Sequence, residues 1–295
     1  MDISGVFTAI VTPFKDNLTL DEEGFEILLE RQVKSKVAGV VPVGTTGESA
    51  TLSYEEHKKV VELCIEHISS KKTVIAGAGS NSTREAIDLA KHAENVGADA
   101  VLVITPYYNK PQQRGLVRHY KEVAAAVEIP VVVYNVPSRT GIDIAPETIR
   151  EIAKIDNIAA IKEATGDISK ISRIVELCSE DIAILSGNDE LTLPILSLGG
   201  RGAISVASNV VPDEMSKLVE YGMEGDIKKA REIHYKLLPL FKALFLETNP
   251  APVKEMLAEL KVINRYVRPP LVEVENSTKE RIRNVINDLK SEGVL

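Results

Sequence analysis

The chain has 295 residues and a formal net charge of −8, with a sequence pI near 5.4. This acidic balance argues against nucleic-acid binding, which needs a clustered basic surface. No run approaches the roughly 18 apolar residues of a membrane span, and the segment Met1–Ser4 has no basic, apolar leader. We therefore expect a cytoplasmic protein without a signal peptide. The histidines show no metal-ligand spacing, so we also expect no metal.

Eight short apolar runs, rich in β-branched residues, alternate with longer segments of helical periodicity. The expected strands are Val6–Val11, Ala38–Val43, Thr73–Ala78, Ala100–Thr105, Pro130–Asn135, Ile158–Lys162, Ile182–Ser186 and Ala203–Val206. The helical segments between them include Glu22–Ser35, Tyr54–Ser69, Thr83–Val96 and Gly115–Val127. Ser53 and either Asn81 or Ser82 are candidate N-caps, and we expect Gly39 and Gly97 to end helices just before strands.

This alternation predicts a parallel sheet covered on both faces, because the strands are continuous apolar runs. Eight units favour a single (β/α)8 TIM barrel over residues 1–224. A doubly wound open sheet is the alternative, although no Gly-x-Gly-x-x-Gly follows the first strand. The remainder, residues 225–295, is expected to form a helical extension packed on the barrel. The helices expected after the eighth strand are Pro212–Tyr221, Gly225–Glu247, Pro250–Leu260 and Thr278–Glu292.

Reactive side chains follow several of the expected strands. In a (β/α)8 barrel the active site lies at the carboxyl ends of the strands, so these groups should meet on one face. The segments are Gly44–Glu48, Thr105–Asn109, Tyr134–Gly141, Lys162–Glu163 and Ser186–Asp189. Together they offer hydroxyls, phenols, one amine and one guanidinium to that face.

Lys162 ends a buried strand, Ile158–Lys162. A lysine in an apolar site loses proton affinity and can attack a ketone to form an imine. Taken alone, such a residue is more often a lysine that merely reaches solvent from a strand end, since most lysines are exposed. The nearby Tyr134, Thr45 and Tyr108 favour the catalytic interpretation, because linked hydroxyls can carry the protons that imine chemistry moves.

Two segments could bind anions. Thr45 and Thr46 lie between glycines, and such a loop can turn amides and hydroxyls toward a carboxylate. Arg139 could bind a second carboxylate with both arms of its guanidinium. The glycine-rich segment Leu198–Gly202 resembles a phosphate loop but precedes the eighth strand, at the opposite end of the barrel. We therefore expect its glycines to end a helix and allow close packing, and we predict no phosphorylated substrate.

These segments closely resemble the 4-hydroxy-tetrahydrodipicolinate synthase (dihydrodipicolinate synthase) family of the N-acetylneuraminate lyase superfamily. The matching segments are Gly44–Ser49, Thr105–Pro111, Tyr134–Gly141, Ile161–Glu163, Ser186–Asp189 and Glu247–Lys254. The resemblance runs from about Gly5 to the C-terminal helices. The pair Thr45-Thr46 and the segment Pro137–Thr140 are similar to the synthase branch in particular.

The resemblance implies a lyase of lysine and diaminopimelate biosynthesis, a branch of amino-acid biosynthesis, that needs no cofactor. Lys162 would form a Schiff base with pyruvate, and the resulting enamine would attack L-aspartate 4-semialdehyde. Tyr134, Thr45 and Tyr108 would relay protons, with Tyr108 supplied by a neighbouring subunit of a homotetramer. The implied substrate-binding residues are Thr46, Arg139, Gly187 and Ile204, the last two through backbone carbonyls.

The resemblance also implies a site for L-lysine as an inhibitor. Its residues map onto Ser49, Ala50, His57, Asn81, Glu85 and Tyr107, while Tyr54 stands where sensitive members often carry a histidine. The alternative is that Glu85 and His57 are ordinary helix-surface residues. Two other functions stay open at this point. One is a pyruvate-dependent aldolase acting on a sugar acid, which Arg139 argues against, and the other is a non-catalytic sensor of a small ligand.

Overall fold

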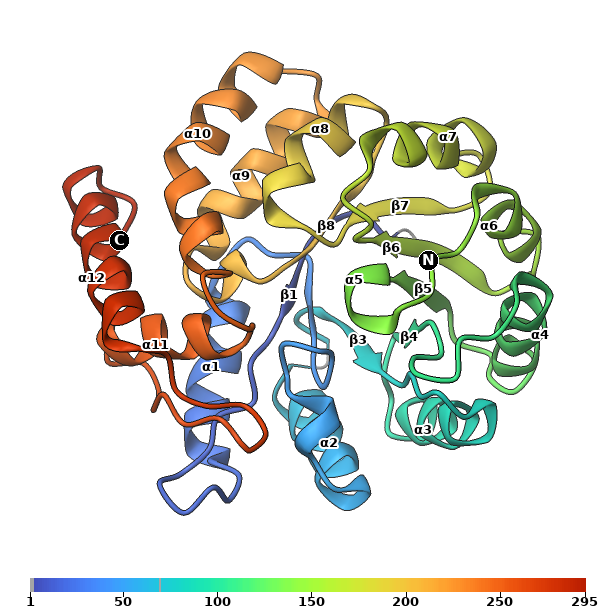
Figure 1. Cartoon of the computed structure of the whole chain (residues 1–295), viewed down its shortest axis with the longest axis horizontal. Coiled ribbons are helices and arrows are strands. Elements are labelled where there is room, and N and C mark those ends of the chain that lie inside the picture. The colour runs from blue at the N-terminus through green and yellow to red at the C-terminus, as the bar shows by residue number, and fades with distance from the viewer. Residues whose placement is uncertain (1–2, 69) are drawn as a thin grey trace.

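The computed structural model describes residues 3–68 and 70–295, and its eight strands close into one parallel barrel (Figure 1). Each strand pairs with the next in sequence, and the last pairs with the first. The strands are β1 (Gly5–Ala9), β2 (Gly39–Val41), β3 (Thr73–Gly77), β4 (Ala100–Ile104), β5 (Val131–Asn135), β6 (Ile158–Glu163), β7 (Ala183–Ser186) and β8 (Gly202–Ser205). The predicted (β/α)8 barrel is confirmed, and the doubly wound alternative is excluded.

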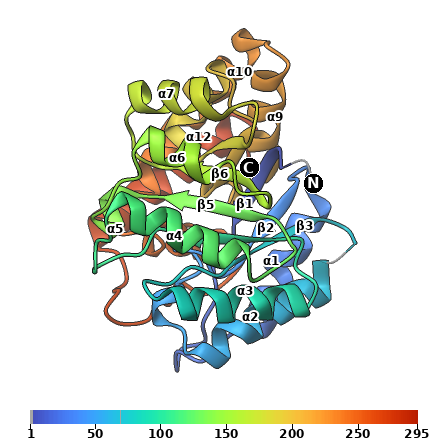
Figure 2. The same cartoon turned by 90° about the vertical axis from the view of Figure 1, so that its right-hand side faces the viewer.

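Helices surround the barrel in the order that the sequence pattern predicts (Figures 1 and 2). They are α1 (Glu22–Lys34), α2 (Tyr54–Ile68), α3 (Thr83–Asn95), α4 (Gln113–Ala124), α5 (Pro137–Thr140), α6 (Pro146–Ile152), α7 (Ile168–Cys178), α8 (Thr192–Ser197) and α9 (Pro212–Met223). Short 3-10 turns η1 (Ser49–Thr51), η2 (Asp189–Leu191) and η3 (Ala207–Asn209) follow β2, β7 and β8. Residue 69, the last of the predicted segment Tyr54–Ser69, lies outside the described residues.

Three further helices follow the barrel: α10 (Ile227–Ala243), α11 (Ala251–Glu259) and α12 (Asn276–Ser291). Helix α10 packs on α9 and α12, and α11 packs on α12, so this segment lies against one side of the barrel (Figure 1). The C-terminal helices are therefore present as expected, although α10 ends four residues before the predicted Glu247. The division of the chain at residue 224 stays a prediction.

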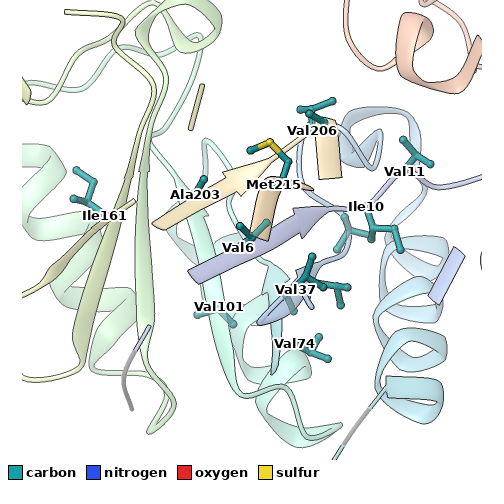
Figure 3. Packing of buried hydrophobic residues seen from close by; sticks show 14 of the residues in the cluster. Val6, Ile10, Val11, Val37, Val74, Val101, Ile161, Ala203, Val206 and Met215 are labelled. Carbon is teal, nitrogen blue, oxygen red and sulfur yellow. The ribbon is translucent and has the colours of Figure 1, made fainter. Parts of the chain in front are cut away.

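Residue alternation along each strand separates two apolar layers. On β6, Ala160 belongs to the cluster inside the barrel, whereas Ile161 packs between the strands and the helices. Figure 3 shows part of this outer layer, in which Val6 and Val101 come from two different strands. The same alternation directs the residue after Ile161, Lys162, into the barrel, so the strand itself determines where the amine lies.

The predicted helix ends are confirmed in three cases. The Ser53 hydroxyl accepts from the Glu56 amide at 3.2 Å, and the Glu56 carboxylate accepts from the Ser53 amide at 2.9 Å, which makes a capping box. Ser82 precedes α3, although its side chain makes no capping bond. Gly97, with φ +97°, follows the end of α3.

The expectation that Gly39 ends a helix is wrong. Helix α1 ends at Lys34, and Gly39 is the first residue of β2. A Cβ at this position would lie 2.2 Å from the Thr73 carbonyl oxygen and 2.9 Å from the Phe7 ring. Glycine is needed here for close packing inside the sheet, not for a left-handed helix end.

The glycines of Leu198–Gly202 act as predicted. Gly199 has φ +107° just after α8, and a Cβ on Gly200 would lie 2.6 Å from the Ile195 side chain. A Cβ on Gly202 would lie 2.0 Å from the Gly5 carbonyl oxygen in the neighbouring strand β1. The segment therefore ends α8 and lets β8 approach β1.

Candidate active site

Lys162 and Tyr134 face each other at the carboxyl ends of β6 and β5. The two residues are Cα partners in the parallel ladder, and the Lys162 Nζ lies 4.2 Å from the centroid of the Tyr134 ring. Both side chains are buried, with 6% of each residue exposed. The register of two adjacent strands therefore brings the predicted nucleophile and the predicted proton carrier into contact.

A cavity of about 460 Å³ opens above this pair. Its walls include six of the predicted site residues, which come from the ends of β2, β5, β6 and β7. The lining residues are Thr45, Thr46, Tyr134, Val136, Ser138, Arg139, Lys162, Ala164, Gly187, Asn188, Asp189, Glu190, Val206, Phe241, Lys242, Phe245 and Asn249. The six predicted residues among them are Thr45, Thr46, Tyr134, Arg139, Lys162 and Gly187. The volume suits small substrates of the kind that the sequence predicts.

The glycine at position 187 makes room for the lysine. A Cβ there would lie 3.1 Å from both Cγ and Cε of Lys162 and 2.8 Å from the Ala164 Cβ. The contact with Ala164 is closer than real Cβ contacts allow, and the two contacts with Lys162 are tighter than most. The absence of a side chain at Gly187 therefore lets the Lys162 chain extend along the cavity wall.

The loop after β2 is held from several sides. The Thr12 hydroxyl donates to the Gly47 carbonyl oxygen at 2.7 Å, and Asn249 Nδ2 donates to the Thr46 hydroxyl at 3.0 Å. Arg139 Nη2 reaches the Asn249 carbonyl oxygen at 3.4 Å. The predicted anion-binding residues Thr46 and Arg139 are thus joined through Asn249, a residue of the segment that precedes α11.

Two of the predicted catalytic and substrate-binding residues, Tyr108 and Ile204, lie outside the walls of this cavity, as do all six residues of the predicted inhibitor site. Tyr108 is 88% exposed and has φ +70°, so its ring points to solvent in the single chain. Ile204 is 1% exposed, and its side chain packs in the cluster inside the barrel. Tyr107, from the predicted inhibitor site, is 39% exposed and lines a second cavity.

This second cavity, of about 480 Å³, lies beside the first. Its lining includes five of the six residues predicted for L-lysine, namely Ser49, Ala50, His57, Glu85 and Tyr107, together with Tyr54. The sixth, Asn81, is not in the lining, and its carbonyl oxygen accepts from Asn109 Nδ2 at 2.7 Å. Thr45, Arg139 and Asn249 line both cavities, so the two spaces share a wall.

Two polar side chains of the second cavity, Glu85 and His57, already have hydrogen-bond partners within the chain. Ser80 Oγ donates to the Glu85 carboxylate at 2.7 Å, and His57 Nε2 lies 2.8 Å from the Gly77 carbonyl oxygen. Burial lowers the pKa of His57, which favours the neutral ring. Glu48 also lines this cavity but is paired with Lys254, so Glu85 is the carboxylate that the cavity offers to a cationic ligand.

Sequence reasoning missed the contribution of the C-terminal helices. The first cavity is also lined by Phe241 and Lys242 of α10, by Phe245 just after that helix, and by Asn249 in the following loop. Asp189 accepts from the amides of Val206 and Ala207 at 3.1 and 2.9 Å. The segment Glu247–Lys254 marked this region as part of the resemblance, but no local pattern indicated which of its side chains would face the site.

A parallel barrel with an interior lysine beside a tyrosine ring is the arrangement expected of a lyase that acts through an imine on lysine. Comparison with known proteins places the chain more narrowly. The model of the dihydrodipicolinate synthetase family matches residues 2–289, and the chain belongs to this family. Its relatives include the 4-hydroxy-tetrahydrodipicolinate synthase of Methanocaldococcus jannaschii, 51% identical over 97% of this chain and 98% of that protein.

Comparison with solved structures supports the same family. The dihydrodipicolinate synthase of Acinetobacter baumannii, described as complexed with pyruvate, is 41% identical over 100% of both chains, with a TM-score of 0.96. That of Cyanidioschyzon merolae, described with lysine bound, is 38% identical over 99% of both chains, with a TM-score of 0.94. A variant described as monomeric is 46% identical over 99% of this chain and 98% of that chain, with a TM-score of 0.95, so assembly varies among these proteins.

The expected function follows from family membership. Enzymes of this family condense pyruvate with aspartate semialdehyde in lysine biosynthesis, and the chain is a lyase of this kind. Among the described residues, no helix is long and apolar enough to span a membrane.

Proposed function

We propose that this chain joins pyruvate to L-aspartate 4-semialdehyde through an imine on Lys162. The observation that carries the proposal is the contact between the Lys162 amine and the Tyr134 ring at the base of a cavity that also holds Thr45 and Arg139. No histidine is among the described residues that line this cavity. We assign the proton transfers to hydroxyl groups, because Tyr134 and Thr45 lie in the same lining as Lys162.

The reaction begins when the neutral Lys162 amine attacks the ketone carbon of pyruvate. Loss of water gives the imine, and removal of a methyl proton gives an enamine. The enamine carbon forms a bond to the aldehyde carbon of the second substrate. The amino group of that substrate then displaces Lys162 from the imine carbon, which closes the ring and frees the enzyme.

Two carboxylates need binding sites during this sequence. Thr45 and Thr46 are proposed to hold the pyruvate carboxylate through hydroxyls and backbone amides at the loop after β2. Arg139, at the cavity wall, is proposed to bind the carboxylate of the aldehyde substrate. The carbonyl groups of Gly187 and Ile204 would shape the base of the pocket.

Proton transfer is assigned to Tyr134, Thr45 and Tyr108. Because Tyr108 is exposed in its own chain, it is proposed to complete the site of a neighbouring subunit. Activity then requires at least a dimer, and a homotetramer in the cytoplasm is the expected form. The chemistry draws on side-chain groups alone, and the expectation that no metal or organic cofactor takes part stays a prediction.

Borohydride trapping tests the nucleophile. Two lysines, Lys162 and Lys242, line the cavity, which provides a matched control. Reduction in the presence of pyruvate should add one adduct to the native chain and to Lys242→Ala, and none to Lys162→Ala. An adduct on Lys242 would contradict the assignment. A non-catalytic sensor would form no adduct, and a sugar-acid aldolase would form one but fail to consume aspartate semialdehyde.

We also propose that L-lysine inhibits the enzyme from the second cavity. The Glu85 carboxylate can pair with an ammonium group, and Tyr107 can bond to a carboxylate. Because Thr45 and Arg139 line both cavities, occupancy of one would alter the other, and the coupling would be reciprocal. Tyr54, whose hydroxyl donates to the Glu85 carbonyl oxygen at 3.3 Å, occupies part of this space, so the inhibition is expected to be weak.

Titration calorimetry with pyruvate present tests this regulation. L-Lysine should bind to the native chain at millimolar concentration, and Glu85→Ala should reduce the binding. A titration without heat would remove the inhibitor site and leave the catalytic assignment intact.

A further inference from the structure

Buried polar residues lie on the outer side of β5 and β6, behind Lys162 and Tyr134. Strand alternation places Asn135 and Glu163 outside the barrel wall, directly behind the reactive pair. These two residues are also Cα partners in the ladder, one step after the pair Tyr134 and Lys162. Both Asn135 and Glu163 are fully buried, at 0% exposed.

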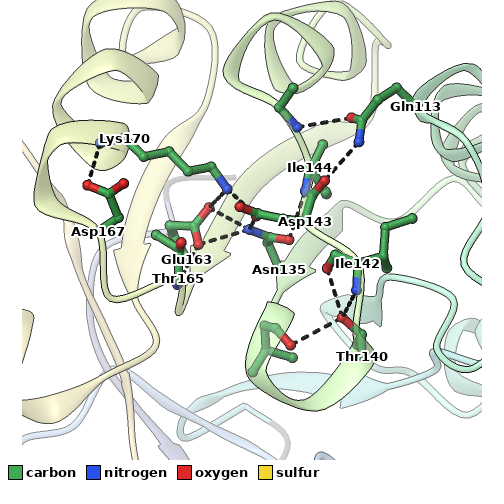
Figure 4. A network of polar contacts seen from close by, with 12 residues as sticks. Gln113, Asn135, Thr140, Ile142, Asp143, Ile144, Glu163, Thr165, Asp167 and Lys170 are labelled. Carbon is green, nitrogen blue, oxygen red and sulfur yellow. Dashed lines mark hydrogen bonds and ion pairs between the residues drawn. The ribbon is translucent and has the colours of Figure 1, made fainter.

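The Glu163 carboxylate is surrounded by donors (Figure 4). Asn135 Nδ2 lies 3.0 Å from each of its two oxygens, and the Thr165 amide donates to Oε1 at 2.7 Å. Lys170 Nζ lies 3.7 Å from Oε2. The carboxylate therefore connects the ends of β5 and β6 and fixes the first turn of chain beyond Lys162.

The network continues outward through Asp143. Asn135 Nδ2 donates to the Asp143 carboxylate at 2.7 Å, and Lys170 is paired with the same carboxylate. Asn135 Oδ1 accepts from the Ile144 amide at 3.2 Å. The strand ends are thus tied to the loop before α6 and to helix α7 (Figure 4).

Stability alone does not explain this arrangement. Burial raises the pKa of Glu163 to about 7 despite the nearby Lys170, so ionising this carboxylate costs free energy. Apolar residues of the same volume often replace buried charged clusters without loss of stability. The cluster lies where β5 and β6 end, next to the two residues that would do the chemistry.

We propose that Glu163 is a positioning residue, which acts through Asn135 and the Thr165 amide to hold Lys162 at its reacting distance from Tyr134. This inference rests on the proposed imine mechanism. The carboxylate does not touch substrate, because it lies on the outer side of the strands. A displacement of about 1 Å at a reacting group can slow a reaction about 10²-fold. Hydrogen bonds that hold the ends of β5 and β6 rigid should therefore increase the reaction rate.

Glu163→Gln tests the proposal with little change of volume. Donors face both oxygens, so the new amide nitrogen meets a donor in either orientation. We expect kcat and the rate of borohydride trapping at saturating pyruvate to fall about 10- to 100-fold, with KM for pyruvate within about twofold of the native value. Thr45 and Thr46, which are proposed to bind pyruvate, follow β2, so the affinity for pyruvate should be spared.

Two variants extend the test. If Glu163 acts through its hydrogen bonds with Asn135, the effects of the two substitutions should not add. The double variant Asn135→Ala with Glu163→Gln should then have a kcat no lower than that of the slower single variant. Asp143→Asn weakens the same network from its half-exposed edge and should lower kcat about threefold, which keeps the test valid if Glu163→Gln fails to fold. Glu255→Gln is the control, because Glu255 is buried and paired with Arg265 but lines neither cavity.

The outcomes separate the two proposals. A native chain that forms no adduct overturns the imine mechanism itself. A native chain that forms the adduct, with unchanged kcat in Glu163→Gln or Asp143→Asn, overturns only the positioning role. Equal losses in Glu163→Gln and Glu255→Gln, or a raised KM with native kcat, would likewise overturn it.

Discussion

Removal of Lys254 should destabilise the protein strongly and also disturb the loop that lines both cavities. Lys254 and Glu48 form an ion pair in which both side chains are 0% exposed. The Lys254 amine also donates to the Tyr266 carbonyl oxygen at 2.8 Å and lies 4.1 Å from the centroid of the Phe14 ring. Burial lowers the pKa of Lys254 to about 8, with Glu48 acting against that change.

The magnitude follows from what Lys254→Met leaves behind. The Glu48 carboxylate would keep the Arg268 amide, 3.1 Å away, but would lose its buried cation. Breaking one partner of a buried ion pair costs about 3–5 kcal/mol. At about 2–4 °C for each kcal/mol in a chain of this size, Tm should fall by roughly 6–20 °C.

The double variant identifies the cause. Lys254→Met with Glu48→Gln removes both charges, so it should unfold at a higher temperature than Lys254→Met alone. Thermal unfolding of the native chain, the two single variants and the double variant gives the coupling free energy. KM for pyruvate, measured on the same samples, should rise in Lys254→Met, because Glu48 belongs to the loop that carries Thr45 and Thr46. A double variant whose loss equals the sum of the single losses would refute the reasoning.

Four further predictions use single variants. Gly187→Ala should lower kcat at least 10-fold, because its Cβ would lie 3.1 Å from the Lys162 chain; native kcat would show that the lysine can move aside. Tyr134→Phe should slow turnover by about 10²–10⁴ while pyruvate still binds, and near-native turnover would remove this phenol from the proton relay. Arg139→Ala should raise KM for aspartate semialdehyde much more than KM for pyruvate, and equal effects would contradict its assigned role. The pKa of Glu163 is raised from 4.5 to about 7 by burial, so its contribution to stability is present below pH 4.5 and is lost as pH rises through 7. The free energy of unfolding of the native chain relative to Glu163→Gln should therefore fall by roughly 3 kcal/mol across this interval, and a constant difference would contradict the buried carboxyl.

The order of strands and helices was readable from local patterns. Apolar runs bounded by turn residues predicted all eight strands, and their parallel arrangement placed the reactive segments on one face. Lys162 could be selected because a lysine at the end of a buried strand is unusual, and Tyr134 because its strand is the neighbour of that of Lys162. Alternation along the strands was equally local, and it could have marked Asn135 and Glu163 as the outward-facing pair.

Only the tertiary structure decided which distant segments complete the site. Asn249 contacts Thr46 across 203 residues of sequence, and Lys254 contacts Glu48 across 206. No local pattern encodes such contacts, because they depend on how α10 and α11 pack against the barrel. The wrong prediction for Gly39 has the same cause, a contact between segments that are distant in sequence. A glycine before a strand fits a helix end as well as a strand start, and the close approach of the Thr73 carbonyl exists only once β2 and β3 are paired.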